Sequence, residues 1–150
     1  MASLYVSGPC DPRFMAGEAA LGVPVESPDK AVDVLLSEVP WKEDRESAWS
    51  LMLDTKHRLL SVELMSMGAV SNTFMAPREL FRSALLSNAA AFIVAHNHPS
   101  GDPEPSSDDC AVTRRLASAS KTLGVELLDH LVVGFPSTKA WVSLARRGHV

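Results

Sequence analysis

The chain has 150 residues, of which 46% are hydrophobic, and its formal net charge is −4. This length suits one domain with a single core, and the hydrophobic fraction excludes a wholly disordered chain. The acidic balance gives no general attraction to nucleic acid, and no apolar run of about eighteen residues is present to span a membrane. We therefore expect a cytoplasmic globular protein with no membrane partner.

The amino-terminal segment, residues 1–26, contains three prolines and three glycines without a sustained periodicity, so we expect an irregular arm. A single domain is then expected over residues 27–150. Cys10 and Cys110 lie a hundred residues apart, which supports neither a disulfide framework nor a thiolate zinc site. Cys110 is expected to be a buried, inert thiol.

The first predicted helix begins after Ser27, an N-cap residue followed by proline, and Pro40 ends it. Two strands follow. Residues 48–53 carry large apolar side chains at alternate positions, and residues 59–67 form a second run after a turn at residues 56–58. We expect these two strands to pair as a hairpin.

The next helix is predicted from Pro77 to Asn88, because asparagine favours the left-handed conformation in which helices often end. Residues 90–95 have no polar side chain, which suits a strand that is buried on both faces. A further helix is predicted to follow Ser106 and to end at Gly124.

Residues 125–134 are rich in strand-forming side chains, and residues 140–144 supply a short final strand. Strands and helices in this order predict an α/β fold, in which a mixed β-sheet has helices packed on its faces. The sequence shows no internal repeat and no low-complexity tract, so a single core remains the simplest organisation.

The apolar run at residues 90–95 leads directly into His96 and His98. Side chains two apart on a strand share a face, so both imidazoles can bind one cation. Asp109 is the best third ligand, because Ser106 as the N-cap places it in the first helical turn, where the macrodipole favours negative charge. Two imidazoles and one carboxylate leave a fourth position for water, as a catalytic zinc site requires.

Hydrolysis at such a site also needs a carboxylate that takes a proton from water and returns it to the leaving group. Three glutamates lie upstream, near the edges of predicted elements: Glu46, Glu63 and Glu79. Glu63 is inside a predicted strand, and Glu79 is in a first helical turn, where it complements the dipole without any catalytic role. Placement alone therefore does not decide which of the three glutamates is the base.

Asp129 and His130 are neighbours in the predicted strand over residues 125–134. Either residue could orient a ligand imidazole by a hydrogen bond to the ring nitrogen that does not bind the metal. A structural hydrogen bond is the simpler role, and we expect it for both.

The order Glu, His-x-His, seven residues, Ser, two residues, Asp resembles the motif of the JAMM (MPN-domain) metallopeptidases. Within that superfamily the chain is most similar to RadC. The similarity extends from about Glu46 to Gly148, roughly two-thirds of the chain, and the run His96–Pro103 is highly specific. The similar segments are Leu53–Arg58, Pro77–Glu79, His96–Asp109 and Leu127–His130.

The resemblance implies an α-β-α sandwich that holds Zn²⁺ and hydrolyses a peptide or isopeptide bond in a peptide or protein substrate. It favours Glu46 as the base, because the JAMM glutamate stands just before the first core strand. In the implied mechanism, zinc acidifies its water and polarises the substrate carbonyl, Glu46 transfers the proton, and Ser106 hydrogen-bonds the developing oxyanion.

RadC-like proteins often carry an added helical, DNA-binding-type region at the amino end, where this chain has the short leader 1–26. The traditional name of the family suggests the alternative function, a binding module associated with DNA repair or recombination, in which the metal is structural or vestigial. The basic clusters at residues 56–58, 114–115 and 146–147 are more simply read as scattered surface charge. Nucleic acid is thus a weakly supported partner, and the complete ligand set favours catalysis.

Overall fold

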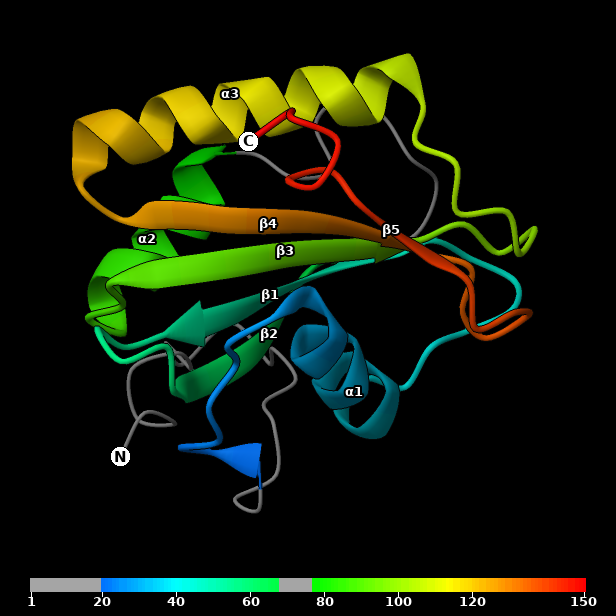
Figure 1. Cartoon of the computed structure of the whole chain (residues 1–150), viewed down its shortest axis with the longest axis horizontal. Helices are drawn as coiled ribbons and strands as arrows, with labels where there is room; N and C mark the ends of the chain where they lie inside the picture. Colours follow the sequence, from blue (N-terminus) through cyan, green and yellow to red (C-terminus); the bar gives the residue numbers. More distant parts are fainter. Residues whose placement is uncertain (1–19, 68–76) are drawn as a thin grey trace.

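The computed structural model describes residues 20–67 and 77–150, which form one five-stranded sheet with three helices (Figure 1). In chain order the elements are α1 (Pro28–Glu38), β1 (Ser47–Leu53), β2 (Leu59–Met67), α2 (Pro77–Leu86), β3 (Ala91–Asn97), α3 (Ser107–Leu123), β4 (Glu126–Val133) and β5 (Trp141–Ser143). The strand order is β2-β1-β3-β4-β5. Strands β3 and β4 are parallel and the other pairs are antiparallel, which confirms the mixed α/β fold.

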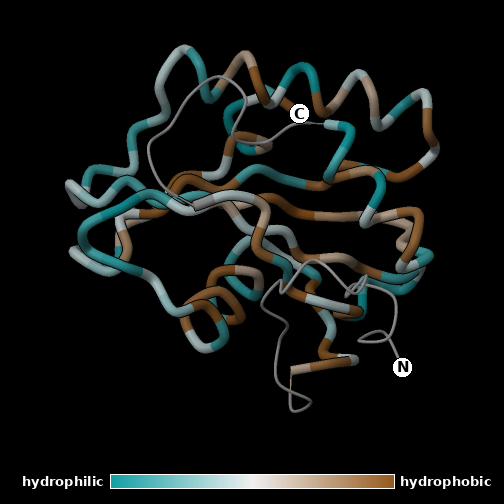
Figure 2. Tube along the Cα trace, turned by 180° about the vertical axis from the view of Figure 1, so that it is seen from behind, coloured by the Kyte–Doolittle hydropathy of each residue, from teal (hydrophilic) through white to brown (hydrophobic). Residues whose placement is uncertain are grey.

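Helices cover both faces of the sheet, and a cluster of buried apolar side chains lies between the sheet and the helices on each face. Helix α1 packs on one face through Ala31 and Leu35, whereas α2 and α3 pack on the other through Leu80 and Leu116 (Figure 1). Figure 2 shows hydrophobic stretches along the strands between these layers. Every residue of β1 and β3 is consequently buried, which explains why the β3 sequence is a nearly continuous apolar run.

The helix ends lie where local signals predicted them. The Ser27 side chain accepts a hydrogen bond from the backbone N–H of Lys30 at the start of α1. Asn88 follows α2 with a positive φ of 55°, and Gly124 caps α3 in the left-handed conformation with φ 73°. These signals depend on contacts within one helical turn, so the sequence alone defines them well.

The expected amino-terminal arm is described only from residue 20 onward, and Cys10 lies outside the described residues. Residues 20–26 run beside the β1–β2 hairpin, where Val25 donates a 2.8 Å backbone hydrogen bond to His57 and is itself buried. Cys110 is partly exposed in α3, in contrast to the buried position expected for it. Within residues 20–67 and 77–150, no helix has the length and apolar character needed to cross a membrane.

Candidate metal centre

The three predicted ligands meet where the carboxyl end of β3 approaches the amino end of α3 (Figure 1). Nε2 of His96 lies 3.1 Å from Oδ1 of Asp109 and 3.2 Å from Nε2 of His98. Nε2 of His98 lies 3.3 Å from Oδ2 of Asp109. Tetrahedral ligands about 2.0 Å from a zinc ion stand about 3.3 Å apart, so these donor atoms suit such an ion in both type and spacing.

Asp109 is placed by the first turn of α3. The Ser106 hydroxyl accepts a hydrogen bond from the Asp109 backbone N–H at 3.1 Å, and Oδ2 of Asp109 accepts one from the Ser106 backbone N–H at 2.8 Å. This capping box fixes the carboxylate at the helix start. Because a hydroxyl can accept and donate at once, capping leaves the Ser106 O–H proton for another acceptor near the ligands.

His98 lies just beyond β3 and is oriented by the loop that follows. Its Nδ1 is 3.0 Å from the backbone oxygen of Asp102, which can only accept, so Nδ1 carries the proton. Nε2 is then free to face the cation position. The loop is itself anchored, because Ser137 and Thr138 donate hydrogen bonds to the backbone oxygens of Pro99 and Gly101.

The electrostatics of the cluster favour a charged carboxylate. Burial raises the pKa of Asp109, but its contacts with the His96 and His98 imidazoles outweigh burial and hold that pKa well below its ordinary range. The pKa of His98 is raised, chiefly by its hydrogen bond with Asp109. The site therefore attracts positive charge, whether as a proton on an imidazole or as a metal ion.

Glu46 stands immediately before β1, half-buried, beside the same cluster. Ala48 pairs with His96 across β1 and β3, so continuing that register places Glu46 opposite His98, on the face that carries the ligands. Burial raises the pKa of the Glu46 carboxyl, and the charges of His96 and His98 partly oppose this rise. The arrangement brings a second carboxylate to the ligand cluster without making it a ligand.

The backbone on both sides of Glu46 is held by Asn97, the residue between the two histidines. The fully buried Asn97 amide accepts a 2.8 Å hydrogen bond from the N–H of Ser47 and donates to the carbonyl of Arg45 at 3.2 Å. It also donates to the carbonyl of Phe135 at 3.0 Å. One side chain thus joins the end of β3, the start of β1 and the segment after β4.

The two other glutamates lie elsewhere. Glu63 is fully buried in β2, two strands away from β3, where it pairs across the sheet with Ser50 and accepts a 3.1 Å hydrogen bond from Ser61. Glu79 is exposed in the first turn of α2. Of the three candidates, only Glu46 is placed beside the predicted ligands.

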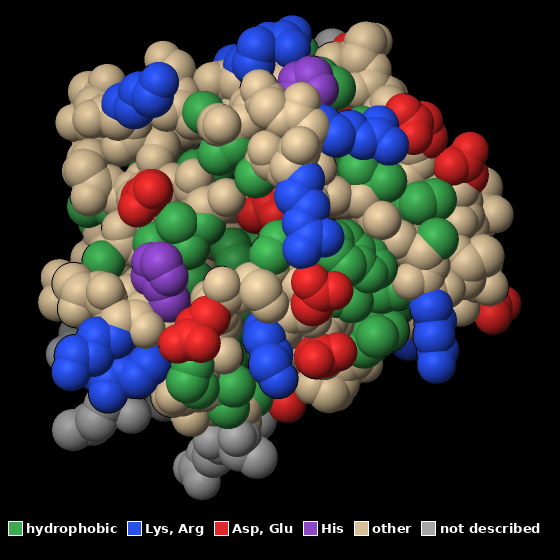
Figure 3. Space-filling view, in the orientation of Figure 1, with side chains coloured by type: hydrophobic (Ala, Val, Ile, Leu, Met, Phe, Trp, Pro, Cys, Tyr) green, Lys and Arg blue, Asp and Glu red, His purple; other side chains and the backbone are tan. Residues whose placement is uncertain are grey.

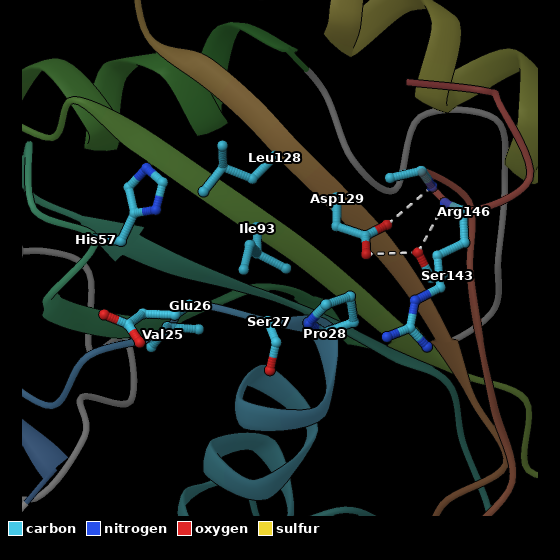
Figure 4. A pocket seen from close by; sticks show the side chains of 11 residues that line it. Val25, Glu26, Ser27, Pro28, His57, Ile93, Leu128, Asp129, Ser143 and Arg146 are labelled. Carbon is cyan, nitrogen blue, oxygen red and sulfur yellow. Dashed lines mark hydrogen bonds between the residues drawn. The ribbon is translucent and has the colours of Figure 1, made fainter.

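Asp129 and His130 point to opposite faces of β4. Asp129 has the structural role expected for it: its carboxylate accepts hydrogen bonds from the Ser143 hydroxyl and the Ala145 N–H, beside a pocket of about 200 Å³ on the α1 face (Figure 4). His130 departs from the expectation, because its Nε2 lies 2.8 Å from Nδ1 of His96. This contact is the alternative role for His130, behind an imidazole of the cluster.

Two of the three basic clusters, at residues 56–58 and 146–147, contain arginines that pair with acidic neighbours. Figure 3 shows lysine and arginine side chains dispersed among acidic ones on the displayed face, without a single basic patch. Ion pairs join Arg58 to Asp54 at 2.8 Å and Arg147 to Glu104 at 2.7 Å. Arg146 likewise pairs with an acidic residue of α1. These pairs reduce the local positive charge that nucleic-acid binding would need.

A RadC-like JAB domain matches residues 25–149. A UPF0758 protein of Alcanivorax borkumensis is 44% identical over 138 residues, which cover 92% of this chain and 60% of the relative. Similar proteins of Desulforudis audaxviator (44% identical) and Methanosarcina acetivorans (42% identical) each match over 73% of this chain, and over 47% and 46% of their own lengths. The chain therefore belongs to the RadC-like JAB domain family.

Proposed function

We propose that this domain is a zinc-dependent metallohydrolase of the JAMM type that cleaves a peptide or isopeptide bond. The observation that supports it is the convergence of His96, His98 and Asp109, with donor atoms 3.1 to 3.3 Å apart, beside the half-buried carboxyl of Glu46. Membership of the family supports the same function. The cytoplasmic location and the peptide or protein substrate stay predictions.

Each residue of the site has a role in this proposal. Zinc, when bound, supplies an acidic water and polarises the scissile carbonyl. Glu46 takes the proton of that water and delivers it to the departing amine, and its raised pKa makes it a better proton acceptor near neutral pH. The Ser106 hydroxyl, held as the helix cap, donates its proton to the oxyanion that develops on the carbonyl oxygen.

The test is an incubation of the zinc-loaded protein with a diverse peptide library, read by mass spectrometry. We expect cleavage by the wild type, and at least about a 100-fold lower rate for Glu46→Gln, which cannot accept a proton. Zinc content should be unchanged in that variant, because Glu46 is not a ligand. Glu79→Gln, on the exposed first turn of α2, is the matched control and should cleave normally.

Equal cleavage by the wild type and Glu46→Gln would contradict the assigned base. Absence of cleavage by a fully zinc-loaded wild type across the library would instead favour the alternative, a binding module in which the metal is structural. The matched part of this chain spans about half the length of these curated relatives, so the same comparison should be repeated with a full-length relative.

A further inference from the structure

A chain of three buried hydrogen bonds lies behind the ligand cluster. Nδ1 of His96 is 2.8 Å from Nε2 of His130, and Nδ1 of His130 is 2.6 Å from the hydroxyl of Thr113. The Thr113 hydroxyl is also 2.7 Å from the backbone oxygen of Asp109, one helical turn earlier in α3. The chain thus begins on one ligand residue and ends on the main chain of another.

The direction of this chain follows from its last acceptor. A carbonyl oxygen can only accept, so the single Thr113 proton must go to the Asp109 oxygen. His130 Nδ1 must then donate to the Thr113 oxygen. A neutral imidazole has one N–H, so when that proton is on Nδ1 the Nε2 of the fully buried His130 accepts from His96.

The metal end of the chain requires the same direction. Nε2 of His96 is the atom that faces Asp109 and His98, so it must be free of a proton to bind a cation. The neutral His96 ring then carries its proton on Nδ1 and donates it to His130. The argument from the Asp109 carbonyl and the argument from the cation-facing nitrogen of His96 are independent. Both place a proton on Nδ1 of His96 and leave Nε2 of His130 as the acceptor.

We propose that Thr113 and His130 are positioning residues, whose directional hydrogen bonds select the His96 tautomer that leaves Nε2 free for the metal. The bonds also tie β3 and β4 to the first turns of α3, so they hold two ligands in a common frame. This inference rests on the metal centre of the proposed function and is independent of hydrolysis. Residues behind a ligand imidazole commonly change metal affinity 10- to 100-fold when they are replaced.

The first measurement is zinc affinity, by competition with a chelator of known affinity. Thr113→Val keeps the shape of the side chain and removes the hydroxyl, so we expect zinc affinity to fall about 10- to 100-fold. Thr113→Ser keeps the hydroxyl, so this variant should bind zinc with the affinity of the wild type. Thr122→Val is the matched control, because the Thr122 hydroxyl also bonds a carbonyl four residues back in α3 but is exposed.

The second measurement is the imidazole tautomer, from long-range proton–nitrogen NMR spectra of the wild type with and without zinc. We expect His130 to be protonated on Nδ1 in both states, and to lose this preference in Thr113→Val. A wild-type His130 protonated on Nε2, or a folded Thr113→Val protein with zinc affinity within about twofold of wild type, would overturn the inference. A wild type that binds no zinc would refute the proposed function, while the His130 tautomer would still decide this inference.

Discussion

The imidazoles of His96 and His98 differ in what holds their second ring nitrogen, Nδ1. His96 donates to another imidazole in the interior, and only 1% of its side chain is exposed. His98 donates to a loop carbonyl, and 18% of its side chain is exposed. The geometry of His98 therefore depends on the anchored loop after β3, whereas that of His96 depends on the core.

The contact between His98 and Asp109 gives the metal-free protein a specific pH dependence. This contact raises the pKa of His98, so folding favours its protonated form. The stability that results is fully present below the unfolded pKa of about 6.5 and is lost as pH rises through the higher folded pKa. We expect the difference in unfolding free energy between wild type and His98→Gln to shrink as pH rises from acidic to alkaline.

Urea unfolding in a chelating buffer, between about pH 5.5 and 9, measures this difference. Titrating groups that do not interact with His98 are common to both proteins, so their contributions cancel in this difference. A difference that stays constant over the whole range would show that His98 is not coupled to Asp109 in the metal-free protein.

The clustering of His96, His98 and Asp109 could be predicted from the sequence because its signals are local. His96 and His98 are two apart at the end of one strand, and Asp109 is placed by its own helix cap. Thr113 and His130 carry no such signal, because their partners lie on other elements 17 and 34 residues away. Their roles depend on the parallel pairing of β3 with β4, which periodicity does not reveal.

At the scale of the elements, Asn97 is the point where three segments are joined. Its amide uses one acceptor and two donors, and all three bonds are to backbone groups around β1 and after β4. Such a residue has no local sequence signal beyond its position between two histidines. Its role follows from the antiparallel pairing of β1 and β3.

Asn97→Asp tests this connection. The carboxylate can still accept from Ser47 but cannot donate to the carbonyls of Arg45 and Phe135, and it places a charge in a fully buried position. An unsatisfied buried acceptor costs about 1 to 3 kcal/mol, so we expect a loss of at least about 2 kcal/mol in unfolding free energy. Urea denaturation of the two proteins measures it.

Asn88→Asp is the matched control, since Asn88 is exposed after α2 and the change in charge is the same. That variant should differ from wild type by less than about 0.5 kcal/mol. If Asn97→Asp were as stable as Asn88→Asp, the three hydrogen bonds would not be holding the segment around Glu46.

At the scale of the whole molecule, the candidate metal centre lies between elements that the sheet alone does not fix to one another. His96 lies in β3 and His98 directly follows it, whereas Asp109 belongs to α3, which connects β3 to β4. The sequence predicted the strands and helices closely, because caps and periodicity mark them. The strand order could not be predicted, because it depends on contacts between distant segments.

Because a metal would join these elements only in the folded protein, zinc should stabilise the whole domain. At a free zinc concentration about 100 times the dissociation constant, the gain is about 2.7 kcal/mol. For a chain of this size, this gain raises the thermal unfolding midpoint by roughly 5 to 10 °C. Scanning calorimetry should show this rise for wild type and none for Asp109→Ala. The control is Asp108→Ala, which removes an exposed acidic residue from the same first turn and should keep the shift. An equal rise in Asp109→Ala would place the stabilising ion elsewhere.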